Sequence, residues 1–474
     1  MNAQDNDPRN PVGPNVRKTS RLRVTEEDTR HKSVSRRKLL RLAAQGAAVP
    51  VAYFMFGGLG AEAHADVRNP ANSPESPRKG AAPWVTPAPG RIVRDFSDPY
   101  LELMRLLHEA AEIEHSLMIQ YLYCAFSVKP IYQGVAGYGS PNTNDLLGVC
   151  VQEMQHLGKV NQFLVALGAA PTLIREDFPY EPQIYPFQFN LEPMSRASLA
   201  KYTWTEAPLG ATDIRNAKTP ADRAFRIELE RTLGNGARPN YVGSLYDAVI
   251  AAAEELIATR DKSLPDLQPW IPALHLIKQD GEIGHFQFFK RVFMGTHEGF
   301  GGRTNVWNRS VSDPHYPARQ LPMNPTAYVG HKKQIQEPNT LALAWLGNLH
   351  YWITLSLLSQ GYSQGSREHI GLALGHMMGP FLSLARKLAS AGAGMPFDPL
   401  SLGYTPCVSG EANSRFVARL LGEADKLEKQ LSAHLPSDFP ASCCRGTRAA
   451  QRRLDSVPRL ARAPTQPWDD GLAG

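Results

Sequence analysis

Three things are scarce in this sequence: cysteine, net charge in its main body, and any repeated pattern. Its 474 residues include five cysteines and no Cys-x-x-Cys pair, which argues against a zinc knuckle or a dithiol of that kind. Residues 66–474 carry 40 Lys and Arg against 39 Asp and Glu, so they lack the excess of positive charge that is typical of a nucleic-acid-binding protein. No internal repeat or heptad array occurs there. The composition, 42% hydrophobic and 20% charged, excludes a disordered, collagen-like or multi-span membrane chain.

A basic leader precedes the main body. Residues 35–41 read Ser-Arg-Arg-Lys-Leu-Leu-Arg, residues 42–60 are moderately apolar, and Ala63-His64-Ala65 is an A-x-A cleavage signature. This order resembles a twin-arginine export signal over residues 1–65. We therefore expect recognition by the twin-arginine export machinery and a periplasmic or secreted protein. The alternative is an uncleaved leader that anchors the chain in a membrane, because an apolar stretch of about 19 residues is near the length that spans a bilayer.

The first strongly periodic segment, residues 100–128, predicts a helix with a carboxylate inside its apolar face. Glu114 follows Ala110 by four residues and precedes Leu117 by three, so the three side chains share one side of the helix. Burying a bare charge is costly. A carboxylate at this position must therefore be paired, protonated or bound to a metal ion.

Two further predicted helices carry Glu and His three residues apart. Glu153 and His156 lie in the segment 144–167, and Glu282 and His285 in a helix that begins near residue 273. Residues i and i+3 share a helix face, so both members of a pair can reach one inward point. With 14 His and 24 Glu in 474 residues, random placement gives 14 × 24/474, or about 0.7, such pairs, whereas three occur. The third pair, Glu112 and His115, is interpreted as lying on the surface or beside the site.

This combination is typical of all-α, ferritin-like four-helix bundles that hold two metal ions. In such bundles two helices each provide a Glu, and two others each provide a Glu-x-x-His pair. Carboxylates bridge the two cations and offset their charge, and imidazoles are neutral ligands suited to iron. The sequence therefore predicts a dinuclear iron or manganese site with the ligands Glu114, Glu153, His156, Glu282 and His285.

An ordered set of motifs resembles a known family, the ferritin-like domain found in the iminophenyl-pyruvate dimer synthases of violacein and rebeccamycin biosynthesis. The likeness covers about residues 96–295. It implies a carboxylate-bridged metal site and says little about the reaction. The motifs that carry it are Glu114-His115, Tyr121-Leu122-Tyr123, Glu153-Met154-Gln155-His156, Ala166-Leu167-Gly168-Ala169-Ala170-Pro171, Leu191-Glu192-Pro193-Met194-Ser195, Glu206-Ala207-Pro208, Val242-Gly243-Ser244-Leu245-Tyr246 and Gly281-Glu282-Ile283-Gly284-His285-Phe286.

The chain departs from that family in two ways. Ser244 occupies a position where the family often has a Glu, so a ligand from the third helix would have to be Asp247 or Glu254. We assign Glu254, because it lies four residues after Ile250 on the same helical face. The second departure is length: the chain has no room for the additional catalytic region of the dimer synthases, which makes dimer synthase activity a poor inference.

The rest of the chain is divided by composition and periodicity. The bundle is expected over residues 96–295, with a long loop insertion at 171–240 that serves as a lid, a substrate wall or plain packing. Glu206, in that insertion, is interpreted as structural, as are His350, His369 and His376. The remaining segments are a linker (66–95), an irregular connection (296–340), a region of additional C-terminal helices (341–435) and a flexible tail (436–474).

Three functions are consistent with these patterns. The first is an exported di-iron-type oxidoreductase that acts on an unknown small molecule; the second is a non-catalytic protein that binds metal or scavenges oxidant. The third is a ferritin-like scaffold without metal, since Ser244 leaves the third-helix ligand uncertain. The sequence leaves a homo-oligomer open.

Overall fold

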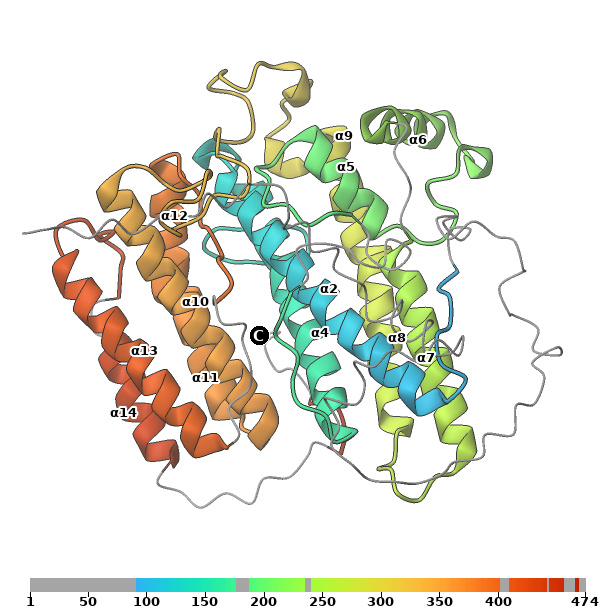
Figure 1. Ribbon diagram of the computed structural model, residues 1–474. Helices are drawn as coiled ribbons and strands as arrows, with labels where there is room; N and C mark the ends of the chain where they lie inside the picture. The colour runs from blue at the N-terminus through green and yellow to red at the C-terminus, as the bar shows by residue number, and fades with distance from the viewer. Residues whose placement is uncertain are drawn as a thin grey trace, which may run out of the picture. The chain divides into compact units, whose positions relative to one another are not determined.

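The computed structural model describes residues 91–175, 187–234, 240–400, 409–440, 443–455 and 465–468, all within one compact unit, Ala82–Gly474. The leader (1–65) and most of the linker lie outside the described residues. The described part is helical, and its β pairing amounts to two isolated bridges, Val128 with Ala318 and Thr326 with Gln334. The prediction of an all-α fold is therefore confirmed (Figure 1).

Four long helical segments form the bundle. They are α2 (Pro99–Ser127), α4 (Leu146–Ala166), α7 (Val242–Thr259) and the continuous run of α8 (Ile271–Gln279), η5 (Asp280–His285) and α9 (Phe286–Met294). Asp98 caps α2 by accepting a hydrogen bond from the Leu101 amide, and Asp145 caps α4 by accepting one from Gly148. α2 packs against α4 and α7, and α7 packs against α8 (Figure 1).

The segment between α4 and α7 is not the long loop that the sequence indicated. It contains α5 (Arg196–Thr205), the 3-10 turn η3 (Ile214–Asn216) and α6 (Pro220–Leu233). Ser195 and Ser198 form a reciprocal cap at the start of α5, and Thr219 followed by Pro220 starts α6. The prolines and aromatics at 171–190 obscured these local start signals. α5 packs against α9 and α6, which places its C-terminal end beside the bundle.

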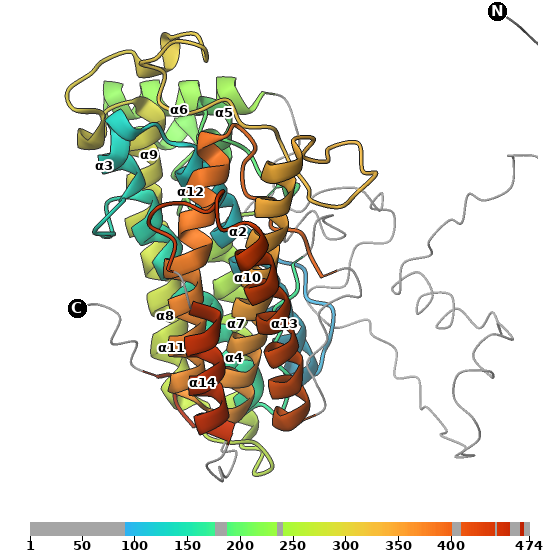
Figure 2. The same ribbon diagram turned by 90° about the vertical axis from the view of Figure 1, so that its left-hand side faces the viewer.

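A second group of helices follows the bundle. It comprises α10 (Pro338–Gln364), α11 (Arg367–His376), the π-helical turn η8 (Met377–Phe381), α12 (Leu382–Ser390), α13 (Gly410–Gln430) and α14 (Cys443–Asp455). α10 packs against α11 and α13, and α13 packs against α14 (Figure 2). α14 lies within the stretch interpreted as a flexible tail, and it is instead anchored by the buried side chains of Cys444, Thr447 and Gln451.

Within the described part of the chain, α10 is the helix long and apolar enough to cross a membrane. Of its apolar window, 83% is buried inside the protein. It has almost no solvent-exposed face, since nearly every residue from Leu343 to Tyr362 is buried. A helix buried on all sides is typical of a protein core. α10 also contacts α4, and α12 contacts α2, so the two helical groups pack directly on each other.

Short helices connect the longer ones. They are η2 (Pro130–Tyr132), α3 (Gln133–Ala136), η4 (Gln268–Trp270), η6 (Glu298–Phe300) and η7 (Val306–Asn308). In η4, Trp270 is buried and stacks on Phe163 of α4, with the rings 4.8 Å apart and 3° from parallel. This stack fixes the start of α8 against α4, which carries two of the predicted ligands.

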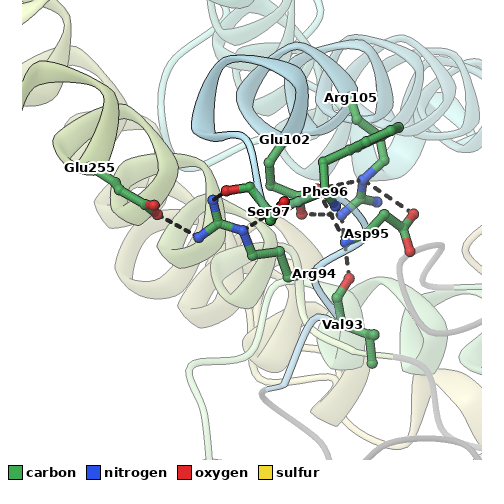
Figure 3. A network of polar contacts seen from close by, with 8 residues as sticks. All are labelled: Val93, Arg94, Asp95, Phe96, Ser97, Glu102, Arg105 and Glu255. Atoms are coloured by element: carbon green, nitrogen blue, oxygen red, sulfur yellow. Dashed lines mark hydrogen bonds and ion pairs between the residues drawn. The ribbon is translucent and has the colours of Figure 1, made fainter. Parts of the chain in front are cut away.

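A network of charged side chains ties the chain before α2 to the bundle (Figure 3). The Glu102 carboxylate accepts hydrogen bonds from the backbone amides of Asp95 and Phe96, at 3.2 and 3.1 Å, and also pairs with Arg105. Arg94 donates to Glu255 of α7 and to the Ser97 carbonyl. The last residues of the segment interpreted as a linker therefore belong to the folded unit.

Candidate metal centre

Five buried side chains from four elements converge inside the bundle. None is more than 3% exposed. Their ligand-type atoms form two groups of three, each with all atoms within 4.8 Å of one another, and the two groups share Glu153. The members are Glu114 of α2, Glu153 and His156 of α4, Glu206 at the C-terminal cap of α5, and His285 at the end of η5.

Glu153 is the centre of the arrangement because its two oxygens face different histidines. Oε2 lies 3.1 Å from His156 Nδ1, and Oε1 lies 3.0 Å from His285 Nδ1. Glu114 Oε2 is 3.6 Å from the same nitrogen of His156, and Glu206 Oε2 is 3.7 Å from that of His285. The cluster thus consists of two positions, each with one imidazole and one carboxylate of its own, joined by a shared carboxylate.

The outer nitrogen of each histidine contacts a residue from the other histidine's helical segment. His156 Nε2 lies 3.2 Å from Asp280 Oδ2 of η5, and His285 Nε2 lies 3.3 Å from Gln152 Oε1 of α4. Such outer contacts fix the ring orientation and the tautomer of a metal-ligating histidine. They leave both Nδ1 atoms pointing at Glu153.

Two tyrosines hold the outer carboxylates. The Tyr246 hydroxyl, on α7, donates to Glu114 Oε1, and the Tyr121 hydroxyl, on α2, donates to Glu206 Oε1 at 2.5 Å. In both cases the second oxygen, Oε2, is the one that faces a histidine. The third bundle helix therefore contributes a hydroxyl that positions a carboxylate.

Three atoms at the centre have no hydrogen-bond partner among the described residues, although all are buried. They are Glu114 Oε2, Glu153 Oε1 and His285 Nδ1. Buried polar atoms are almost always satisfied, so unpartnered ones at the two neighbouring positions indicate a missing group at each. Carboxylate oxygens and imidazole nitrogens are ligands for divalent iron and manganese, so the residues fit two such ions.

The pKa values of the clustered side chains are shifted in different directions. Burial, reinforced by the neighbouring Glu153 charge, raises the pKa of Glu114 to about 8. Burial alone would also raise the pKa of Glu153, but the charge of His285 and the hydrogen bond with His156 outweigh it and hold this pKa well below its usual value. Burial would lower the pKa of both histidines; contacts with Asp280 and the carboxylates instead raise that of His156, and Glu153 and Glu206 raise that of His285 to about 10. Without metal, two imidazolium groups therefore provide the positive charge that two metal ions would otherwise provide.

The structure brings together four of the six residues assigned from the sequence: Glu114, Glu153, His156 and His285. Their role as ligands stays a prediction. Glu254 is exposed on α7 and lies outside the cluster. Glu282 is only half-buried, 3.8 Å from the Lys278 ammonium, and also lies outside it.

The π-helical turn explains why Glu282 and His285 do not share a face. A π-turn closes i to i+5 contacts in place of i to i+4, so it shifts the register of the helix by one residue. In η5 the acidic residue that reaches the site is Asp280, five residues before His285. Glu282 instead lies over Gly243 of α7, where a Cβ atom would be 2.2 Å from its Oε1.

Glu206 is the member of the cluster that the sequence analysis missed. It lies in the segment interpreted as an insertion, beyond any Glu-x-x-His pair and at the end of a short helix. Its only sequence signal was the Glu206-Ala207-Pro208 motif, which was interpreted as structural. Ser244, at the family's usual Glu position, is buried, and Asp247 is exposed and paired with Lys278 at 2.7 Å. Among the described residues, the third carboxylate of the cluster is therefore Glu206 and comes from α5 rather than from α7.

Gly281→Ala is expected to disrupt one of the two positions selectively. A Cβ atom at residue 281 would lie 2.9 Å from Glu206 Oε2, so this carboxylate would have to move away from His285. We expect metal affinity at that position to fall about 10- to 100-fold, the usual effect of disturbing a ligand's support. Gly284→Ala, on the same turn with nothing within 4 Å of its Cβ, is the matched control and should bind normally. Equal affinities of the two variants in metal titrations would contradict this reading.

Comparison with known proteins agrees with this architecture. Residues 107–269 match the family model described as Ferritin-like. Dichlorochromopyrrolate synthase of Lentzea aerocolonigenes is 30% identical over an alignment 134 residues long, which covers 23% of this chain and 13% of that protein. The chain thus matches only a small part of that relative's length. No solved structure matches the chain significantly. The matched residues, 107–269, include every member of the cluster except His285.

Proposed function

We propose that this ferritin-like domain binds two divalent metal ions, iron or manganese, and uses them for oxidative chemistry on a small molecule. One ion would be held by Glu114, Glu153 and His156, and the other by Glu153, Glu206 and His285. The observation that carries the proposal is the shared carboxylate of Glu153, whose two oxygens face histidines of different helices at 3.1 and 3.0 Å. A bridging carboxylate of this kind is the common feature of dinuclear sites in helical bundles.

The protein's own residues would prepare the site for redox-active metal. Such a pair of ions supplies electron transfer to oxygen or peroxide when it is bound. Tyr246 and Tyr121 fix one oxygen of Glu114 and of Glu206, which leaves the other oxygen free for a metal ion. Tyr202 and Phe289 pack on the Tyr121 ring, at 4.7 Å each, and help to exclude water from that side.

A surface cavity beside α5 supports the proposal that the substrate is a small molecule. Its volume is about 930 Å³, within the range of ligand sites in proteins. Trp204, two residues before Glu206, forms part of its wall, and so does Tyr241, which stacks on Trp204 and lies five residues before Tyr246. The segment expected to be a lid or substrate wall thus lines a cavity. Two residues of the cavity wall are close in sequence to two residues of the site.

The burial of the site favours a second function, consumption of a small oxidant. None of the five ligand-type residues is more than 3% exposed, so an organic molecule would need a movement of the surrounding helices to reach them. Oxygen and peroxide need much less room. In this case the protein would remove oxidant without turning over an organic substrate.

The leader adds a proposal about location. Residues 35–41 and the A-x-A signature at 63–65 support export by the twin-arginine route, with a periplasmic or secreted mature chain. That route carries folded proteins, so it is compatible with metal loading before export.

Metal content and oxygen consumption test these proposals together. Residues 66–474, reconstituted anaerobically with iron or manganese, are expected to bind about two ions per chain. Oxygen or peroxide consumption that requires an organic molecule would support the oxidoreductase, whereas consumption without one would support oxidant scavenging. Chains that bind neither metal would overturn both proposals and leave a metal-free scaffold.

A further inference from the structure

A second cluster of buried ligand-type side chains lies among the C-terminal helices and shares no residue with the bundle site. His350 comes from α10, His376 from the end of α11, Glu428 from α13, and Cys444 and Thr447 from α14. Both histidines and the cysteine are fully buried, and Glu428 is 7% exposed. One ligand-type atom each of His350, Glu428 and Cys444 lies within 4.8 Å of the others.

Glu428 contacts both of the other two ligand-type residues. Its Oε1 accepts a hydrogen bond from the Cys444 thiol at 3.0 Å and lies 3.4 Å from His350 Nε2. His350 Nε2 has no hydrogen-bond partner among the described residues. A fully buried imidazole nitrogen is thus aimed at a carboxylate and a thiol without making a hydrogen bond to either.

The other side of His350 is held by a relay of polar contacts. Its Nδ1 lies 3.0 Å from His376 Nδ1, and His376 Nε2 lies 2.8 Å from Thr447 Oγ1. A neutral imidazole carries a single N–H, so each of the two rings donates from one nitrogen and accepts at the other. If His376 donates that proton to Thr447, its Nδ1 accepts from His350 Nδ1, and the lone pair on His350 Nε2 faces Glu428.

We propose that His350, Glu428 and Cys444 bind one zinc-type divalent cation, with His376 and Thr447 orienting His350. Cysteine, histidine and carboxylate are the ligands that zinc takes in proteins. With zinc bonds of about 2.0 Å to nitrogen and oxygen, two tetrahedral ligand atoms lie about 3.3 Å apart, close to the 3.4 Å between His350 Nε2 and Glu428 Oε1. The thiolate and the carboxylate together neutralise the dication.

Binding replaces the thiol proton with the cation. The S–H bond of Cys444 breaks, a bond between sulfur and metal forms, and the proton is released to solvent, with no change of oxidation state. Without the cation, the thiol keeps this proton and donates it to Glu428 Oε1. On binding, Sγ would move away from Glu428 by about 0.5 Å, because sulfur–oxygen edges around zinc are about 3.5 Å.

The site would fasten α14 to the body of the protein. Few side chains of this helix are buried, namely Cys444, Thr447 and Gln451 among those described, and the first two belong to the cluster. A metal bond from Cys444 to residues of α10 and α13 would therefore supply much of the attachment of α14.

Cobalt substitution tests this proposal independently of the bundle site, which contains no cysteine. Addition of Co²⁺ to the full chain is expected to produce a thiolate-to-cobalt charge-transfer band, and Cys444→Ser should lose this band and about one cobalt per chain. Cys443→Ser removes the neighbouring thiol, which is only partly buried, and should keep both. Glu428→Gln, which retains the thiol, should bind cobalt at least about tenfold more weakly.

Two results would overturn the proposal. The first is the absence of the band in the wild-type chain, which would leave a hydrogen-bonded cluster only. The second is a band that persists in Cys444→Ser, which would assign it to another cysteine. If Cys444→Ser fails to fold, X-ray absorption of the zinc-loaded Glu153→Ala chain decides, through the presence or absence of one sulfur at about 2.3 Å from zinc.

Discussion

Glu153→Ala is expected to lose both metal ions of the bundle, whereas Glu114→Ala and Glu206→Ala are each expected to lose one. The reason is the position of Glu153 in both three-residue groups, while each of the other two carboxylates belongs to one. Its removal leaves each position with one imidazole and one carboxylate, and leaves two histidines buried without their shared counter-ion. Iron or manganese analysis of chains reconstituted with that metal should give about two, one, one and zero bundle-site ions for the wild type, Glu114→Ala, Glu206→Ala and Glu153→Ala, with the zinc of the C-terminal cluster counted separately.

Two carboxylates outside the cluster provide matched controls. Glu254→Ala and Glu282→Ala remove acidic residues from the same bundle helices, and both side chains lie outside the cluster. Their metal content should equal that of the wild type. Loss of an ion in Glu282→Ala would show that the π-turn rearranges when metal binds. Full metal content in Glu153→Ala would make the proposed dinuclear site wrong.

Metal affinity at the bundle site is expected to fall steeply with decreasing pH. In the metal-free protein the pKa values of His156 and His285 both lie above their ordinary value, that of His285 at about 10, so both rings are protonated at neutral pH. Each ion must displace one imidazole proton before it can bind. Below those pKa values, each apparent dissociation constant should therefore rise about tenfold for every unit by which the pH is lowered.

Manganese titrations at pH 6 and pH 7 measure this effect, and calorimetry in buffers of different ionisation enthalpy counts the protons released. The position of Glu114 should show the larger dependence, because the pKa of this carboxyl is raised to about 8 and its proton must also leave. Affinities that do not change between the two pH values would mean that the histidines are neutral in the metal-free protein. The assignment of two imidazolium groups to the metal-free cluster would then be wrong.

Three of the four residues that the sequence analysis placed correctly in the cluster lie on regular helices, and the fourth, His285, ends the π-turn. Glu153 and His156 lie on an uninterrupted α-helix, where a spacing of three residues puts both on one face. Glu114 was found from its place in an apolar stripe. Glu282 was misplaced because a π-turn cannot be seen in hydrophobic periodicity, and it replaced the expected pair by Asp280 and His285, which are five residues apart.

Glu206 and His115 show a different limit of prediction from sequence, namely that local patterns do not report tertiary contacts. Glu206 caps a ten-residue helix, so no long periodic pattern marks its environment, and only tertiary packing brings it to the bundle. His115 was expected on the surface or beside the site, but it is buried, with its Nε2 2.8 Å from the Tyr351 hydroxyl of α10. Burial and the charge of Arg175 lower the pKa of His115 to about 3. Its partner lies 236 residues away in the sequence, beyond the reach of local patterns.

The core position of α10 has a consequence for how the protein denatures. Its consecutive residues His350 and Tyr351 contact different parts of the protein: His350 contacts His376 of α11, and Tyr351 contacts His115 of α2. Neither the bundle nor the other C-terminal helices can separate from α10 without exposing the apolar side chains of α10 that they cover. The bundle and the C-terminal helices should therefore melt in one cooperative transition, and a substitution that loosens either group should lower the melting temperature of both.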